Sequence, residues 1–129
     1  LGISEIIQKN YKGHLPQEMD TLVKLPGVGR KTANVVLGNA FGVPSLVVDT
    51  HVTRLANRLG WVGPGLLDPE KIEEQLQKKI PREKWIVLSH WLILHGRSTC
   101  GARKKECGTC PLNAECPSVK KGVEDWKTK

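Results

Sequence analysis

The feature that most constrains this fold is a short turn, Leu25-Pro-Gly-Val-Gly-Arg-Lys31, between two stretches with helical periodicity. Pro26 cannot continue a helix, and the two glycines allow backbone angles that other residues avoid. The turn therefore predicts two helices joined by a tight hairpin. Glycine amides before a helix N-terminus can hold a phosphate, and a plain turn with no ligand is the alternative. Apolar residues then recur along one helix face, at Ala33, Val36, Leu37, Ala40 and Phe41.

The remaining sequence also has helical spacing, which predicts an all-α fold. Asp68-Pro69-Glu70 combines the cap, the proline and the acidic residue that are typical of a helix start. Residues 85–94 are apolar on nearly every side, so we expect a buried core helix there that ends at Gly96. Only residues 45–48 have the composition of a strand, and that run is short.

The charge of the chain favours a polyanionic partner. Among 129 residues, 20 are Lys or Arg and 13 are Asp or Glu, which gives a net charge of +7. This charge suits DNA, RNA and acidic membranes equally. The sequence has no apolar run long enough to span a bilayer and no secretion signal, so we expect a protein without a membrane partner, cytoplasmic if it is prokaryotic. Because the chain begins at Leu1, we expect a further segment upstream.

Four cysteines near the C-terminus form the pattern C-x6-C-x2-C-x5-C, at Cys100, Cys107, Cys110 and Cys116. Thiolates this close in sequence can surround one metal centre. The spacing alone leaves zinc and an iron–sulfur centre equally open. A pair of disulfides is disfavoured in a reducing compartment.

Two further residues carry candidate chemistry. Lys31 stands at the start of the helix after the hairpin, whose positive end favours the neutral amine that a nucleophile needs. A solvated surface lysine is the alternative. Asp49 precedes another helical stretch, where it is expected to cap the helix N-terminus. A carboxylate in that place could both cap the helix and take part in a reaction.

Three motifs together resemble the endonuclease III family of DNA glycosylases: residues 25–37, Val48-Asp-Thr-His-Val-Thr-Arg54, and the cysteine spacing just after Trp91-Leu-Ile-Leu-His-Gly-Arg97. The resemblance implies a helix-hairpin-helix DNA glycosylase fold with a C-terminal four-cysteine [4Fe-4S] loop. It assigns residues 1–43 to the remnant of a six-helix domain and residues 44–129 to the iron–sulfur cluster domain. The N-terminal part of the family pattern has no counterpart in this chain.

By the same resemblance, the chain is a monomeric bifunctional DNA glycosylase and AP lyase of base excision repair. It would remove oxidised pyrimidines from double-stranded DNA and nick abasic sites by β-elimination. Lys31 matches the catalytic lysine that forms a Schiff base, and Asp49 matches the catalytic aspartate. A non-catalytic DNA-binding fragment and a zinc-binding interaction module remain as alternatives. The residues expected to touch DNA are Gly27, Val28, Gly29, Arg30 and Thr32 in the hairpin, and Arg103, Lys104 and Lys105 in the cysteine loop.

Overall fold

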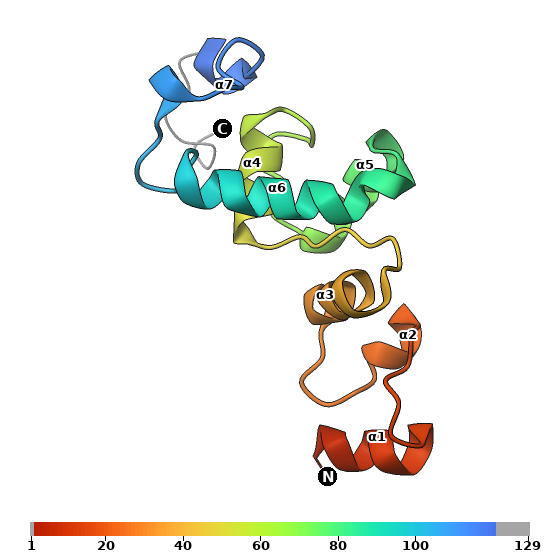
Figure 1. Ribbon diagram of the computed structural model, residues 1–129. Helices are drawn as coiled ribbons and strands as arrows, with labels where there is room; N and C mark the ends of the chain where they lie inside the picture. The colour runs from red at the N-terminus through yellow and green to blue at the C-terminus, as the bar shows by residue number, and fades with distance from the viewer. Residues whose placement is uncertain (1, 121–129) are drawn as a thin grey trace. The chain divides into compact units, whose positions relative to one another are not determined.

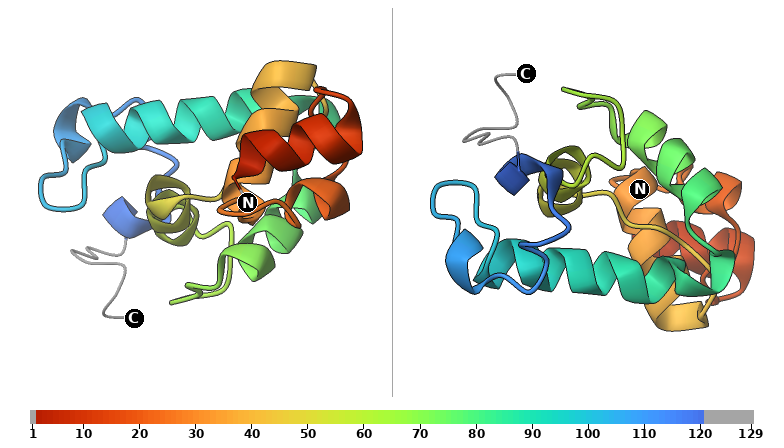
Figure 2. Two further views of the ribbon diagram at one scale, coloured as in Figure 1. Left: turned by 90° about the horizontal axis from the view of Figure 1, so that it is seen from below. Right: turned by 90° about the horizontal axis from the view of Figure 1, so that it is seen from above.

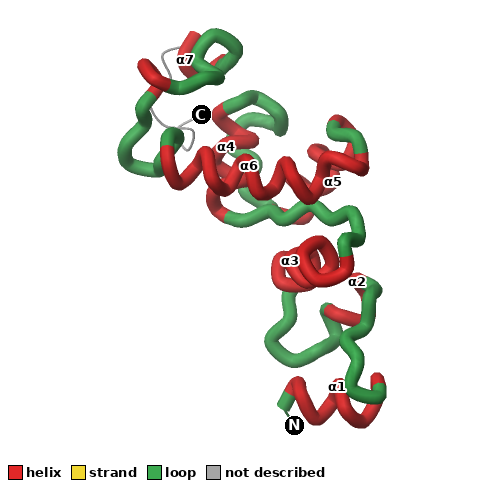
Figure 3. The backbone as a smooth tube through the Cα atoms, in the orientation of Figure 1, coloured by secondary structure: helices red, strands yellow, loops and turns green. Residues whose placement is uncertain are grey.

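The computed structural model describes residues 2–120 and divides the chain into two compact units, Leu1–Ser45 and Leu46–Lys129. Every regular element of the described residues is a helix, as Figure 3 shows, which confirms the predicted all-α class. Residues 45–48 form no strand. None of the described helices is both long enough and apolar enough to cross a membrane.

The first unit holds three helices, α1 (Ile3–Tyr11), α2 (Met19–Leu22) and α3 (Arg30–Phe41), labelled in Figure 1. Helix α3 is followed by Gly42 as its C-cap, whose φ of 64° lies in the left-handed region that terminates helices. The unit has its own small core, because the apolar faces of α2 and α3 pack together. That core consists of Leu22, Leu25, Ala33 and Leu37.

The second unit is built around α6, its longest helix, which packs against α4 and is drawn from two further directions in Figure 2. Its helices are α4 (Thr50–Arg58), α5 (Pro69–Lys79), η1 (Arg82–Lys84), α6 (Trp85–Ser98), η2 (Cys107–Thr109) and α7 (Pro117–Lys120). The start of α5 is as predicted. Asp68 Oδ1 accepts a hydrogen bond from Glu70 N at 3.0 Å, and Pro69 occupies the first turn.

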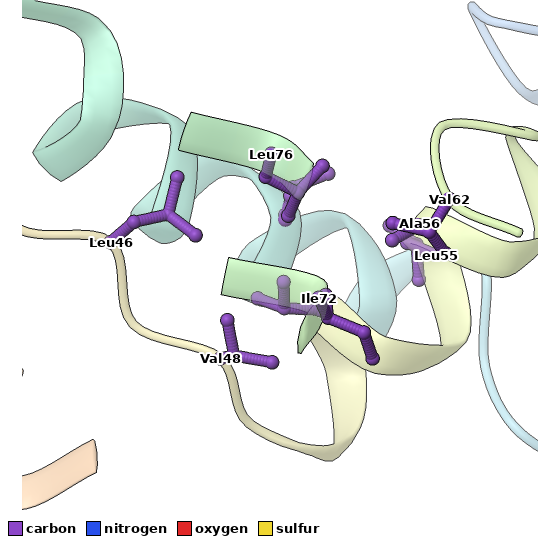
Figure 4. Close-up of a cluster of buried hydrophobic side chains, with 9 residues drawn as sticks. Leu46, Val48, Leu55, Ala56, Val62, Ile72 and Leu76 are labelled. Carbon is purple, nitrogen blue, oxygen red and sulfur yellow. The ribbon is translucent and has the colours of Figure 1, made fainter. Parts of the chain in front are cut away.

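The core of the second unit joins helices to the segment that precedes α4. Leu46 and Val48 of that segment point towards Ile72 and Leu76 of α5 in Figure 4. Because this short segment is anchored by buried side chains, it fixes where α4 begins. The buried residues of this core are Leu46, Val48, Val52, Leu55, Ala56, Val62, Ile72, Leu76 and Leu92.

Helix α6 differs from the sequence-based expectation in two respects. It is not a fully buried core helix: 58% of Trp91 and 61% of Leu94 is exposed, and only Ser89, Leu92 and Gly96 are buried. The apolar composition predicted burial, but α4 covers only one face of the helix. The helix also does not end at Gly96, since it continues to Ser98.

Candidate functional site

The hairpin between α2 and α3 is closed by local contacts. Leu25 is buried, and its carbonyl oxygen accepts a hydrogen bond from Val28 N at 3.2 Å. Between them, Gly27 adopts a φ of 75°, which L-residues with side chains rarely adopt. The glycine at position 27 is therefore required by the turn itself.

Neither the backbone angles nor the packing within the chain requires glycine at position 29. It caps the N-terminus of α3 with φ −90° and ψ 179°, angles that any residue adopts. A Cβ atom at this position would meet nothing within 4 Å. Gly29 also offers no side chain to cap the first amides of α3. This end of the helix is thus open to close approach by a group from outside the chain.

Three of the predicted DNA-contacting and catalytic residues lie beside that opening. Arg30, Lys31 and Thr32 are the first three residues of α3, and all three are exposed. Val28 is half-buried within the hairpin. The helix N-terminus and two basic side chains therefore place positive potential on one exposed surface, which suits an anionic group.

Asp49 caps α4, which confirms its predicted structural role. Its Oδ1 accepts a hydrogen bond from Val52 N at 2.8 Å, and the residue is half-buried. This bond fixes the orientation of the carboxylate. Lys31 belongs to the first unit and Asp49 to the second.

The four cysteines line one pocket in the second unit. All four thiols are free and partly exposed. Apolar side chains of α4 and of the C-terminal segment form much of the remaining wall. The residues around the pocket include Cys100, Cys107, Cys110, Cys116, Leu55, Leu59, Leu112, Val119, Arg58 and His95.

The donor set, four thiols on the wall of one pocket, fits a sulfur-ligated metal centre. Four tetrahedral thiolates around zinc would stand about 3.8 Å apart, given Zn–S bonds of about 2.3 Å. Among the described residues, no three His, Cys, Asp or Glu side chains gather closely enough to hold a single metal ion. As placed, the side chains of the described residues therefore form no ready-made site for a single ion.

Sequence reasoning missed Arg58, the last residue of α4. Only 4% of it is exposed, and its Nη1 lies 3.0 Å from Cys100 Sγ. The same atom donates to the carbonyl oxygens of Cys100 and Gly101, at 3.2 and 2.8 Å. No local signal identifies this contact, because a basic residue in the last turn of a helix is usually only a surface charge.

Two further side chains support the cysteine loop and were also missed. Arg54 Nε donates to the carbonyl oxygen of Cys100 at 3.2 Å, and its Nη2 donates to that of Gly96 at 2.9 Å. Burial, reinforced by the neighbouring charge of Arg58, lowers the pKa of the Arg54 guanidinium. His95 Nε2 lies 3.6 Å from Cys110 Sγ.

The predicted basic tip of the cysteine loop contains Arg103 and Lys104, which are exposed, and Lys105, which is half-buried. Lys104 forms an ion pair with Glu106, with 3.4 Å between Nζ and Oε1. The turn is tight, because a Cβ atom on Gly101 would stand 2.6 Å from the carbonyl oxygen of Lys104. The loop therefore presents a compact basic surface in which one charge is partly neutralised.

Comparisons with known proteins agree with these features. A family model described as "Helix-hairpin-helix motif" matches residues 10–38. The chain is 48% identical over 117 residues to endonuclease III of Bacillus subtilis (strain 168), and the matched region covers 88% of this chain and 52% of the relative. It is 49% identical over 111 residues to endonuclease III of Escherichia coli (strain K12), covering 86% and 52%. The chain is a homologue of endonuclease III.

Solved structures of endonuclease III match the fold as well. One, "Structure of a non-covalent Endonuclease III-DNA Complex", has a TM-score of 0.86 at 42% identity and covers 95% of this chain and 57% of that one. A trapped covalent endonuclease III–DNA intermediate also gives a TM-score of 0.86, at 43% identity, with the same coverage. The predicted helix-hairpin-helix glycosylase fold is confirmed. The chain spans about half the length of the curated endonuclease III relatives that it matches.

Proposed function

We propose that this chain carries the catalytic lysine and the cluster loop of a base excision repair enzyme, a bifunctional DNA glycosylase and AP lyase. Its substrates would be oxidised pyrimidines and abasic sites in double-stranded DNA. One observation carries the proposal: exposed Lys31 stands two residues after Gly29, where a glycine leaves room for a phosphate. The solved endonuclease III complex with DNA and the trapped covalent intermediate support it.

The hairpin would bind a phosphate next to the lesion. Gly27, Val28 and Gly29 bring the chain close to the DNA backbone, and the open N-terminus of α3 supplies amides and positive potential. Arg30 and Thr32 lie on the same turn as Lys31. The damaged nucleotide must leave the base stack, because its C1′ is otherwise shielded within the duplex.

Lys31 would then act as the nucleophile. Its neutral amine attacks the sugar C1′, the bond from C1′ to the base breaks, and the base leaves with its electron pair. The sugar ring then opens: the C1′–O4′ bond breaks, O4′ takes up a proton, and C1′ and the lysine nitrogen are left joined as a protonated imine. This imine acidifies the C2′ proton, and loss of that proton expels the 3′ phosphate and nicks the strand. Asp49 would be the catalytic carboxylate that stabilises positive charge developing on the sugar, and its bond to Val52 N keeps the carboxylate oriented.

The four cysteines would hold a [4Fe-4S] cluster in the pocket that they line. When bound, the cluster would cross-link the loop at Cys100, Cys107, Cys110 and Cys116. That cross-link would keep Arg103, Lys104 and Lys105 in place against the DNA backbone. The matched relatives named above are bacterial, and we place this protein in the cytoplasm as a monomer that acts on the chromosome.

The test is to trap the imine with borohydride on a duplex that carries one abasic site. Lys31→Ala is compared with Lys24→Ala, which removes another exposed lysine of the same unit. We expect a covalent complex with the parent and with Lys24→Ala, and none with Lys31→Ala. A complex with Lys31→Ala would contradict the assigned role. If the parent binds abasic DNA but no covalent complex is trapped, the chain is a non-catalytic DNA-binding module. If the purified protein is colourless and contains zinc, it is a zinc-binding interaction module.

A further inference from the structure

Two buried arginines of α4 lie side by side without a carboxylate partner. Arg54 and Arg58 are 5% and 4% exposed. Within residues 2–120, no ion pair joins either of them to an Asp or Glu, and their acceptors are mainly carbonyl oxygens of residues 96–101. Cys100 and Asp49 exert an attractive charge on Arg54 without forming an ion pair with it. Buried charges without a direct counter-charge are costly, so this pair calls for an anionic neighbour.

The neighbour that the geometry offers is the cysteine pocket. Arg58 lines this pocket together with all four thiols. Its Nη1 already lies 3.0 Å from Cys100 Sγ, while its Nε is buried and has no acceptor among the described residues. A buried donor without an acceptor fits a site whose anionic occupant completes it.

The charges of the proposed cluster match those of the two arginines. Four thiolates bring four negative charges and a [4Fe-4S] core brings two positive ones, so the assembly is a dianion. We propose that Arg58 is the positioning residue of this metal centre: it donates to the Cys100 thiolate and, with Arg54, supplies the counter-charge of the four thiolates. This inference rests on the proposed cluster and adds a role for a residue that is no ligand.

Arg58 also joins the two ends of the cysteine loop. Its side chain holds the first ligand through Cys100 Sγ and the carbonyl oxygens of residues 100 and 101. Its main-chain oxygen accepts from Ser118 Oγ at 2.6 Å and lies 3.9 Å from Sγ of Cys116, the last ligand. Arg58 therefore contacts the first and the last cysteine of the loop and places a positive charge beside the first one.

The experiment compares Arg58→Met and Arg58→Lys with Arg82→Met, which removes an exposed arginine in η1, away from the cysteine loop. Iron and sulfide content, the rate of bleaching by a chelator and the reduction potential are measured on the purified proteins. We expect Arg58→Met to bleach about tenfold faster than the parent, the usual scale for residues that support metal ligands. Its potential falls, because loss of a cation and a sulfur hydrogen bond disfavours the reduced cluster.

Arg58→Lys keeps the charge but loses the planar fork, so we expect fast bleaching with a smaller fall in potential. Arg82→Met should match the parent in both the bleaching rate and the reduction potential. An unchanged bleaching rate and potential in Arg58→Met overturn the inference. If Arg58→Met does not fold, parent-like values for Arg58→Lys overturn it instead. A parent without iron would overturn both the proposed cluster and this inference. If the parent carries iron and the Arg58 variants keep the parent's bleaching rate and reduction potential, only the inference is overturned.

Discussion

Gly96 of α6 lies so close to His51 of α4 that a Cβ atom on Gly96 would stand 3.0 Å from the Cβ of His51. Arg54 takes part in the same contact, since its Nη2 would also be 3.0 Å from that atom and donates to the Gly96 carbonyl oxygen. The same arginine reaches Cys100. The missing side chain at position 96 therefore lets α4 approach α6 and hold the start of the cysteine loop.

A methyl group on Gly96 should cost about 1–3 kcal/mol through overpacking. Alanine also favours a helix interior by about 1 kcal/mol, so Gly96→Ala should reduce the free energy of unfolding by up to about 2 kcal/mol. Urea denaturation measures the change. Gly63→Ala is the matched control, because a Cβ atom there meets nothing within 4 Å, and its effect should stay within about 0.5 kcal/mol. Equal stabilities of the two variants would contradict the close contact at Gly96.

Substitutions of Asp49 should separate its capping role from its proposed catalytic role. Asn caps a helix as well as Asp does, so Asp49→Asn should keep the parent stability, whereas Asp49→Ala should lose about 1 kcal/mol. Both variants should nick abasic DNA about 100-fold more slowly. Asp68→Ala removes the cap of α5 and should lower stability alone. Parent-like nicking by Asp49→Asn would leave Asp49 with only its structural role.

The two hairpin glycines should respond differently to alanine. Gly29→Ala fits the backbone angles and the open space, so its thermal unfolding should match that of the parent. Its affinity for an abasic duplex should fall, because the methyl group occupies the space proposed for the phosphate. Gly27→Ala should unfold at lower temperature, since φ of 75° costs a side chain about 1–2 kcal/mol. Unchanged affinity of Gly29→Ala, measured by fluorescence anisotropy, would place the phosphate elsewhere.

The cysteine loop should contribute to binding through the charge of Arg103. If this side chain meets a phosphate, Arg103→Ala should reduce the slope of log affinity against log salt by about one unit. Lys104→Ala should change the slope less, because Lys104 already pairs with Glu106. Titrations at several salt concentrations with one duplex measure both slopes. Identical slopes for the parent and Arg103→Ala would remove the loop tip from the DNA interface.

Features set by neighbouring residues could be predicted from the sequence, whereas contacts between distant segments could not. Asp49 and Asp68 cap helices through amides two or three residues away, so their roles follow from local spacing. Arg58 and Cys100 are 42 residues apart, and nothing near either residue indicates their contact. The exposure of Trp91 was missed because apolar composition does not tell which faces of a helix are covered. The catalytic pairing of Lys31 with Asp49 stays a prediction.

The separation of 42 positions between Arg58 and Cys100 also bears on how the cysteine loop is assembled. Closing so long a loop of chain has an entropic cost, which the packing of α4 against α6 offsets. The packing of these two helices therefore holds the arginine within reach of the first cysteine. A chain in which α4 and α6 are not packed together would offer iron four thiols without the cation that lies beside them in the folded structure.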